Sequence, residues 1–268
     1  MVILLPAIYP ELCVSGDAGI ILVGGYNIVF LTVLLADCYG RITLERLRLA
    51  VFDCDGTLVD SQHSIVHAME VAFDFHGFDA PNPSAVRRII GLPLVKAIGI
   101  LAPESDIADH PEVAETYKST FRDMRASGDV HEPLFQGVRE TISALVEGGW
   151  LLGIATGKAM RGLVATLEPY DLLECFVTRQ TADIAQGKPH PEMLNRAMAD
   201  TGTDADLTVM IGDTTYDMEM ARNAGTKSVG VTWGYHLPDE LDAAGAHIVI
   251  NEFGALPDAL ESLTEGKT

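Results

Sequence analysis

Residues 47 to 59 read Leu-Arg-Leu-Ala-Val-Phe-Asp-Cys-Asp-Gly-Thr-Leu-Val, and this stretch decides the fold. The apolar run Leu49–Phe52 is typical of a central strand in a parallel sheet, and Asp53 stands where that strand is expected to end. Ligands bind at this edge of open α/β sheets. Two acids one residue apart, Asp53 and Asp55, are costly unless a cation neutralises them or one is protonated. The stretch therefore predicts a Mg²⁺ site or acid/base chemistry, beside the tight turn that Gly56 allows.

Length and charge limit the classes of protein that fit. The chain has 268 residues, enough for one or two domains with a substantial core. Acidic residues outnumber basic ones by 38 to 18, which gives a formal net charge of −20. Nucleic-acid binding needs a basic footprint, so we expect no nucleic-acid partner. The cysteines lack the spacing of a zinc site or of a disulfide framework, which favours reduced thiols in the cytoplasm; they are Cys13, Cys38, Cys54 and Cys175.

The first 46 residues differ from the rest of the chain. Residues 19–36 are strongly apolar and about as long as a membrane helix, but Gly24, Gly25 and Asn27 interrupt them. The basic start of a secretory signal is missing. Three interpretations stay open for residues 1–46: an appended segment that packs or moves freely, a membrane anchor, or translated upstream sequence outside the working protein. The interruptions make membrane attachment the least favoured of the three.

A helical region follows the acidic stretch. Ser61 is expected to cap a helix that continues at helical spacing until Gly77 ends it. From there to Glu132 helical patterns are broken by prolines, and no strand pattern is present. We therefore expect residues 62–133 to form an inserted all-helical unit with a small core of its own.

Strands and helices alternate after Pro133, which predicts βαβ units. The expected fold is a doubly wound, Rossmann-like parallel sheet, built from residues 47–61 and 134–268. The helical unit would then lie as a cap over the carboxyl edge of the sheet. The expected strands are Trp150–Ala155, Cys175–Thr178, Leu207–Ile211 and Ser228–Val231, and the expected helices are Gly137–Glu147, Ala159–Glu168, one after Pro191, and Thr214–Ala224.

Four short stretches stand at or near the ends of predicted strands, where a doubly wound sheet brings them to one edge. Together they offer carboxylates, ammonium groups, a hydroxyl and backbone N–H donors, which suit a phosphoryl group held with Mg²⁺. Because no cysteine or serine is placed beside a histidine, a carboxylate is the natural nucleophile. The stretches are Asp53-Cys-Asp55-Gly-Thr57, Thr156-Gly157-Lys158, Lys188-Pro189 and Gly212-Asp213-Thr-Thr-Tyr-Asp217.

This set of motifs, in this order, resembles the haloacid dehalogenase superfamily over roughly residues 47–260. The resemblance is to the branch with a helical cap between the first and second motifs, the phosphoglycolate phosphatase-like group. It implies that Asp53 is the nucleophile that becomes an aspartyl phosphate. It also implies that Asp55 is the general acid/base, which protonates the leaving oxygen and then activates water.

The same resemblance implies the remaining contacts. Lys188 would neutralise charge between the phosphoryl group and the nucleophile, and Thr156 with the Gly157 amide would hold the phosphoryl oxygens. The second motif has Gly157 where many relatives have asparagine, but the hydroxyl and the amide are retained. In the cap, Lys96 follows Gly91-Leu92-Pro93, where capped relatives often place substrate contacts. Mg²⁺ would be held by Asp53, the Asp55 carbonyl, Asp213 and Asp217.

The expected function is Mg²⁺-dependent hydrolysis of a small phosphomonoester by a cytoplasmic monomer or homodimer. A phosphosugar mutase would use the same site, although such mutases usually carry an arginine directly after the equivalent of residues 91–93, which is absent here. Pyrophosphate is an alternative substrate. A non-catalytic binding protein on the same fold is the alternative from another class, and the intact acids and Lys188 argue against it.

Overall fold

The computed structural model describes residues 34–36, 42–44 and 46–265. The chain divides into two compact units, one ending at Arg46 and the other beginning at Leu47. In the first unit, strand β1 (Leu34–Ala36) pairs antiparallel with β2 (Ile42–Leu44). Most of the apolar stretch 19–36 lies outside the described residues. Within those ranges, none of the helices has both the length and the apolar character that a membrane crossing requires.

The second unit contains a six-stranded sheet in the order β5-β4-β3-β6-β7-β8, and every pair of neighbouring strands is parallel. The first strand in the sequence, β3, therefore lies in the middle, as its apolar run predicts. This confirms the doubly wound parallel sheet. The strands are β3 (Arg48–Phe52), β4 (Trp150–Thr156), β5 (Thr178–Thr181), β6 (Thr208–Gly212), β7 (Lys227–Val231) and β8 (Ile248–Ile250).

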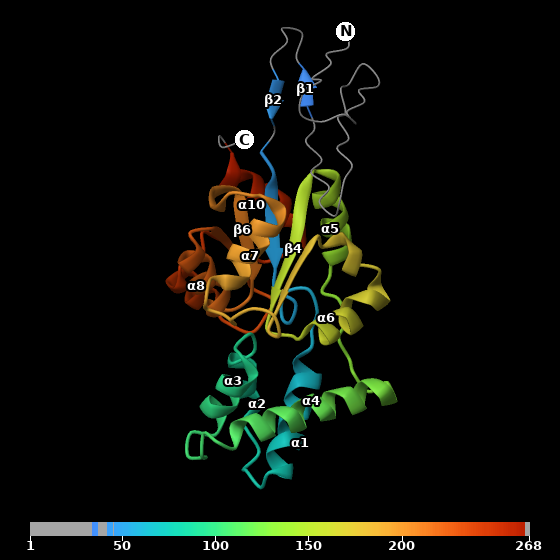
Figure 1. The fold of residues 1–268 in the computed structure, drawn as a ribbon, viewed down its shortest axis with the longest axis vertical. Helices are drawn as coiled ribbons and strands as arrows, with labels where there is room; N and C mark the ends of the chain where they lie inside the picture. Colours follow the sequence, from blue (N-terminus) through green and yellow to red (C-terminus); the bar gives the residue numbers. More distant parts are fainter. Residues whose placement is uncertain (1–33, 37–41, 45, 266–268) are drawn as a thin grey trace, which may run out of the picture. The chain divides into compact units, whose positions relative to one another are not determined.

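Helices cover both faces of this sheet (Figure 1). Successive side chains of β3 alternate between the faces: Ala50 and Phe52 join one apolar cluster, and Leu49 and Val51 join the other. The first cluster takes residues from α5 (Val138–Glu147), α6 (Met160–Leu167) and α10 (Leu256–Thr264), and the second from α7 (Glu192–Thr201) and α8 (Thr215–Ala224). Helix α9 (Pro238–Ala244) packs beside α8 and β7.

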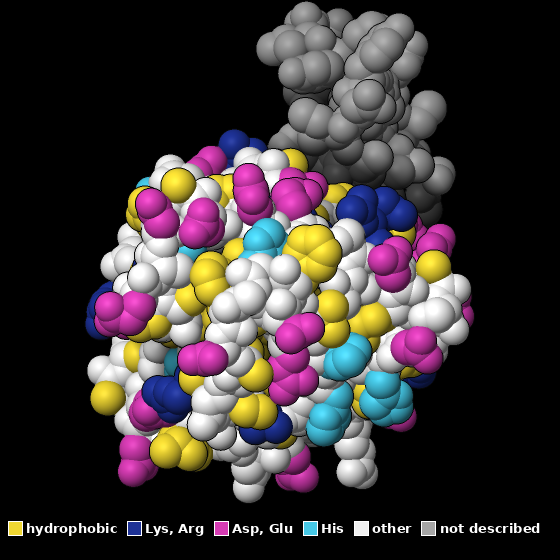
Figure 2. Space-filling model, turned by 90° about the horizontal axis from the view of Figure 1, so that it is seen from below, with side chains coloured by type: hydrophobic (Ala, Val, Ile, Leu, Met, Phe, Trp, Pro, Cys, Tyr) yellow, Lys and Arg dark blue, Asp and Glu magenta, His cyan; other side chains and the backbone are white. Residues whose placement is uncertain are grey.

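Four helices between β3 and β4 form the helical insertion (residues 62–127). They are α1 (Gln62–Phe75), α2 (Pro83–Arg88), α3 (Leu94–Leu101) and α4 (His110–Ser127). Ile65, Phe73 and Ile98 share an apolar cluster that is distinct from the two clusters of the sheet. The insertion lies beyond the carboxyl ends of the strands (Figure 1). Seen from its side, acidic, basic, apolar and histidine side chains are interspersed (Figure 2).

Two regions of the second unit differ from the prediction. The strand expected at 175–178 begins only at Thr178, because residues 173–175 form a short 3-10 helix in which the Cys175 N–H bonds to Leu172. The Phe176 side chain is buried, although Phe176 is not part of the strand. The three-residue strand β8 and the helices α9 and α10 were not predicted. A strand as short as β8 is indistinguishable in sequence from an apolar turn.

Candidate active site

The ends of three neighbouring strands position the core of the site. Because β4, β3 and β6 are adjacent, Thr156, Asp53 and Asp213 lie side by side although they are far apart in sequence. The Asp53 N–H donates to the Ile211 carbonyl at 2.9 Å. This bond extends the hydrogen-bond ladder between β3 and β6 by one residue and fixes the backbone of Asp53. Sheet topology alone therefore gathers three of the four predicted motifs.

Three carboxylates form a buried cluster at this edge. Asp53, Asp213 and Asp217 each offer an oxygen within 4.8 Å of the others. Asp53 is 1% exposed, and the other two are fully buried. Like charges at this separation repel strongly in a dry environment, so the cluster requires a cation.

Lys188 supplies one positive charge to this cluster. Its ammonium is fully buried and lies 2.8 Å from Asp53 Oδ2 and 2.6 Å from Asp217 Oδ1. Burial on its own would lower the pKa of Lys188, but the charges of Asp217 and Asp53 outweigh it and raise that pKa above its ordinary value. Lys188 is therefore charged, and it joins Asp53 to Asp217 of the last motif.

Asp213 is fixed by a hydroxyl and an amide. The Thr57 hydroxyl donates to its Oδ1, and the Tyr235 N–H donates to its Oδ2, both at 2.9 Å. A side chain at Gly56 or Gly234 would overlap the Asp213 carboxylate. Burial raises the pKa of Asp213 well above its usual value, and the charges of Asp217 and Asp53 add to the rise. The structure thus holds an acid in a place that disfavours its charge unless a cation is bound.

Asp217 is oriented by the start of α8. Thr214 precedes this helix, and its N–H (3.1 Å) and hydroxyl (2.7 Å) both donate to Asp217 Oδ2. This arrangement is a capping box, which stabilises the helix start. It leaves Oδ1 directed at Lys188. Helix capping and a role in the site coexist in this residue.

The donor set fits a hard divalent cation. One ammonium stands against three carboxylates, and burial, with a further contribution from Asp217, raises the pKa of Asp53 to about 7 despite Lys188. Asp53 Oδ2 and Asp217 Oδ1 both contact the Lys188 ammonium, so the three carboxylates share a single positive charge. Buried carboxylates in excess of the positive charge around them are the ligands that Mg²⁺ takes. The residues present therefore match the predicted metal.

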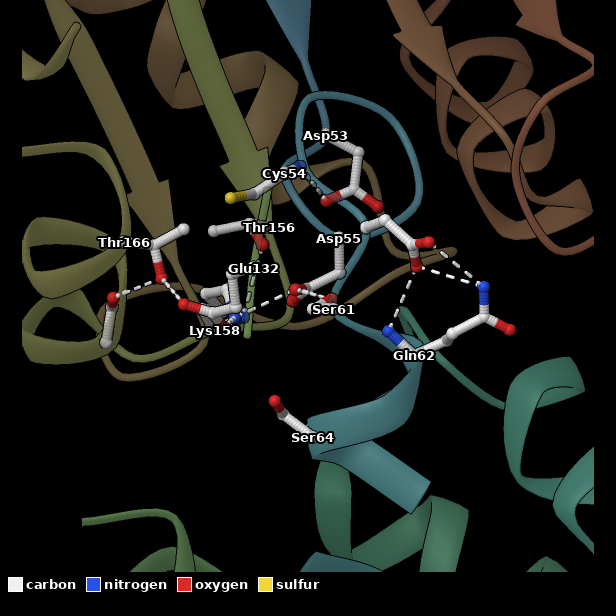
Figure 3. Close-up of polar contacts among 12 residues, drawn as sticks. Asp53, Cys54, Asp55, Ser61, Gln62, Ser64, Glu132, Thr156, Lys158 and Thr166 are labelled. Atoms are coloured by element: carbon white, nitrogen blue, oxygen red, sulfur yellow. Dashed lines mark hydrogen bonds and ion pairs between the residues drawn. The ribbon is translucent and has the colours of Figure 1, made fainter. Parts of the chain in front are cut away.

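Asp55 points away from this cluster, toward the helical insertion (Figure 3). Its Oδ1 accepts a short hydrogen bond from the Ser61 hydroxyl and lies 2.8 Å from the Lys158 ammonium. Ser61 stands at the N-cap position of α1, as expected, but it makes no capping hydrogen bond within the described chain. Its hydroxyl binds Asp55 instead. The prediction that Ser61 caps the helix is therefore wrong about the side chain.

Lys158 continues the contacts of Asp55 into a network that the sequence did not reveal. Its ammonium also lies 2.9 Å from Glu132, a residue directly before Pro133 in the return from the insertion. Glu132 further accepts hydrogen bonds from Arg125 at 2.7 Å and Thr166 at 2.8 Å. Burial opposes ionisation of Glu132, but Lys158 and Arg125 outweigh it and lower its pKa. Glu132 belongs to no motif, so sequence spacing carried no signal for it.

The second motif lies against the insertion. Thr156 is fully buried, and its hydroxyl accepts the Lys158 N–H at 3.2 Å. A Cβ on Gly157 would meet the Gly91 carbonyl oxygen at 3.3 Å. The loop that begins at Gly91 therefore covers the turn in which Thr156 and Gly157 stand.

Lys96 is not brought to this site. It is exposed on α3, and none of the ion pairs found among residues 46–265 includes it. The insertion instead contacts the core through Arg88, whose guanidinium pairs with Glu240 at 2.7 Å and whose carbonyl accepts the Tyr216 hydroxyl at 3.1 Å. Lys96 therefore has no ion pair with the residues of this site, and its contact with substrate stays a prediction.

Comparisons with known proteins agree with this geometry. Residues 50–231 match the family model described as haloacid dehalogenase-like hydrolase. The chain is 39% identical to "Probable phosphatase IndB" of Dickeya dadantii (strain 3937) over 220 residues, which cover 80% of this chain and 94% of that protein. It is 27% identical to a phosphoglycolate phosphatase of Vibrio vulnificus (strain YJ016) over 225 residues, 82% of this chain and 98% of the other. In fold it is similar to a hydrolase from Pseudomonas syringae, with a TM-score of 0.71 and 24% identity, covering 80% of this chain and 98% of that one.

The chain therefore belongs to the haloacid dehalogenase-like hydrolase family. Within that family it is a phosphatase.

Proposed function

We propose that this enzyme hydrolyses a small phosphomonoester with Mg²⁺ bound, through an aspartyl phosphate on Asp53. One observation carries the proposal. The Lys188 ammonium joins Asp53 to Asp217 in a buried cluster that also holds Asp213. A nucleophilic carboxylate needs positive charge beside it to accept a phosphoryl dianion; Lys188 supplies part of that charge, and a cation held by the carboxylates would supply the rest.

In the first half of the reaction, an oxygen of Asp53 attacks phosphorus and forms a new P–O bond. The bond between phosphorus and the ester oxygen breaks, and Asp55 gives its proton to that leaving oxygen. Lys188 offsets the negative charge shared by Asp53 and the phosphoryl group. The Thr156 hydroxyl and the Gly157 N–H hold phosphoryl oxygens.

In the second half, Asp55 takes a proton from water. The resulting hydroxide attacks the phosphorus of the aspartyl phosphate, which releases inorganic phosphate and restores the Asp53 carboxylate. The reaction therefore takes two steps, and in the second the Asp53 carboxylate is the leaving group. These two steps replace a single, slow displacement of the alcohol by water.

Mg²⁺ would be held by carboxylate oxygens of Asp53, Asp213 and Asp217 and by the carbonyl of Asp55. When bound, it supplies charge stabilisation to the phosphoryl oxygens in the transition state. The protein's own contribution is to hold these ligands in a dry, fixed arrangement, since each of Asp213 and Asp217 is oriented by two hydrogen bonds.

The helical insertion would act as a cap. It lies over the carboxyl ends of the strands and contacts Gly157, so it shields the reacting groups from bulk water. One relative is named for phosphoglycolate, and this chain is proposed to act on a small ester of the same general kind.

The test is a panel of phosphate compounds assayed with Mg²⁺ and with EDTA. The panel contains p-nitrophenyl phosphate, phosphoglycolate, hexose phosphates and pyrophosphate. We expect Mg²⁺-dependent release of phosphate from at least one monoester and none from the Asp53→Asn variant. Turnover of pyrophosphate alone would replace the ester assignment, and hydrolysis by Asp53→Asn would remove Asp53 as the nucleophile.

A further inference from the structure

A chain of alternating charges runs from Asp55 into the helical insertion. Asp55 contacts Lys158 at 2.8 Å, Lys158 contacts Glu132 at 2.9 Å, and Glu132 contacts Arg125 at 2.7 Å. Arg125 also donates to the Ala165 carbonyl of α6 at 3.0 Å. The network therefore joins an active-site carboxylate, the return segment from the insertion, and helix α4.

This network is buried, which is costly for charged groups. The side chains of Lys158 and Glu132 are 11% and 5% exposed. Replacing buried ion pairs by apolar side chains is often neutral or stabilising, so stability alone is a weak explanation for four charges in a row. Their place beside Asp55 indicates a role in the reaction.

The contacts define which oxygen of Asp55 is available. Ser61 and Lys158 both contact Oδ1 (Figure 3). Among the described residues, these are the contacts that fix the carboxylate, so Oδ2 is the oxygen left to face a leaving group. Without Lys158, one hydroxyl would hold Asp55, and its carboxylate could rotate.

Glu132 in turn determines where the Lys158 ammonium lies. A lysine has a long, flexible side chain, and a single contact with Asp55 would not fix its direction. Glu132 is itself held by Arg125, Thr166 and a position directly before a proline. The Lys158 ammonium also lies over the Phe121 ring of α4, 5.6 Å from its centroid.

We infer that Glu132 and Lys158 are positioning residues for Asp55: Glu132 fixes the Lys158 ammonium, and Lys158 fixes Asp55 Oδ1 so that Oδ2 meets the leaving oxygen. The inference rests on the proposed acid/base role of Asp55. It assigns a function to Glu132, which lies outside the four motifs, and to Lys158, the last residue of the second motif.

The experiment compares two esters that differ in their need for a proton. A nitrophenolate leaves without protonation, whereas an alkoxide requires it, so only the alkyl ester depends on the acid for its departure. The quantity to measure is kcat/KM for phosphoglycolate or another accepted alkyl ester, divided by kcat/KM for p-nitrophenyl phosphate, with Mg²⁺ present. Because kcat/KM reports steps up to release of the alcohol, the later hydrolysis of the aspartyl phosphate does not enter this ratio.

We expect the ratio to fall about 100-fold or more in Asp55→Asn and about tenfold in Glu132→Gln and in Lys158→Met. Lys158→Arg should recover part of the loss, because it retains the charge. The control is Glu240→Gln, which removes an exposed contact between the insertion and the core and should leave the ratio at the wild-type value. A merely structural role would lower both values of kcat/KM together and leave the ratio unchanged.

An unchanged ratio in Glu132→Gln and Lys158→Met, with a lowered ratio in Asp55→Asn, would overturn the positioning role and leave the proposed function intact. Absence of hydrolysis in the wild type would instead overturn the proposed function. If Glu132→Gln does not fold, Lys158→Met and Lys158→Arg decide the question. A crystal structure of Lys158→Met provides a second readout: we expect the Asp55 carboxylate to leave its contact with Ser61, and an unmoved carboxylate would contradict the inference.

Discussion

Gly212 lies directly against Asp217: a Cβ placed on this glycine would overlap the Asp217 carboxyl group. The backbone of Gly212 is in the last position of β6 and needs no left-handed conformation. The absence of a side chain therefore serves the carboxylate, which occupies the space that any other residue would fill. The close approach of β6 to α8 at Gly212 holds the Asp217 carboxylate in contact with Lys188.

Gly212→Ala should displace Asp217 and weaken metal binding while the sheet remains intact. We expect the Mg²⁺ concentration for half-maximal activity to rise about tenfold, since one ligand loses its position. The measurement is a Mg²⁺ titration of phosphatase activity. Gly254→Ala is the matched control, because no described atom lies within 4 Å of a Cβ built there. An equal Mg²⁺ requirement in both variants would show that the Asp217 carboxylate tolerates the methyl group.

Lys188→Met should destabilise the protein in EDTA by about 3–5 kcal/mol, because it leaves buried carboxylates without their counter-charge. The measurement is urea unfolding, with Lys118→Met as the control for an exposed ion pair, which should change stability by less than about 1 kcal/mol. We further expect Mg²⁺ to stabilise the Lys188→Met variant more than the wild type. Equal stabilisation of the two would argue against a shared cation site.

The pH dependence of stability should report on Glu132. Its pKa in the folded protein lies below the ordinary value of 4.5, so it stabilises the fold at pH values above 4.5, and this contribution is lost as the pH falls through the folded pKa. At pH 7, Glu132→Gln should unfold more easily by about 1–3 kcal/mol. The difference from wild type should shrink as the pH is lowered below 4.5. A difference that stays constant down to pH 3 would place the effect in packing rather than in charge.

Removal of residues 1–44 should leave folding and phosphatase activity unchanged, because residues 47–267 form a compact unit separate from residues 1–46. The measurements are the thermal unfolding midpoint and kcat/KM for p-nitrophenyl phosphate, each compared with the full chain. A lower midpoint together with precipitation of the shortened protein would show that the first unit contributes to the second.

The main features of the sheet and of the acidic cluster could be predicted because they depend on local pattern and topology. Asp53 and Asp213 end apolar strands, and in a parallel sheet such positions meet at one edge, whatever their separation in sequence. Asp217 follows Asp213 by about one helical turn, which places the two carboxylates together.

The features that were missed depend on side-chain direction across long separations. Ser61 is correctly placed at a helix start, yet its hydroxyl turns to Asp55 rather than to the helix backbone. Glu132 stands in an irregular segment, so no periodicity indicates that it faces Lys158. Lys96 is exposed on α3, and its predicted contact with substrate stays a prediction.

The burial of the carboxylates has a kinetic consequence. Asp53 is 1% exposed and Asp213 is fully buried, so both carboxylates are almost completely shielded from solvent in the arrangement described. We expect admission of each ester molecule and escape of phosphate to need movement of the helical insertion, whose Arg88 pairs with Glu240 of α9. The frequency of that movement would then limit turnover, however fast the chemistry at Asp53 became.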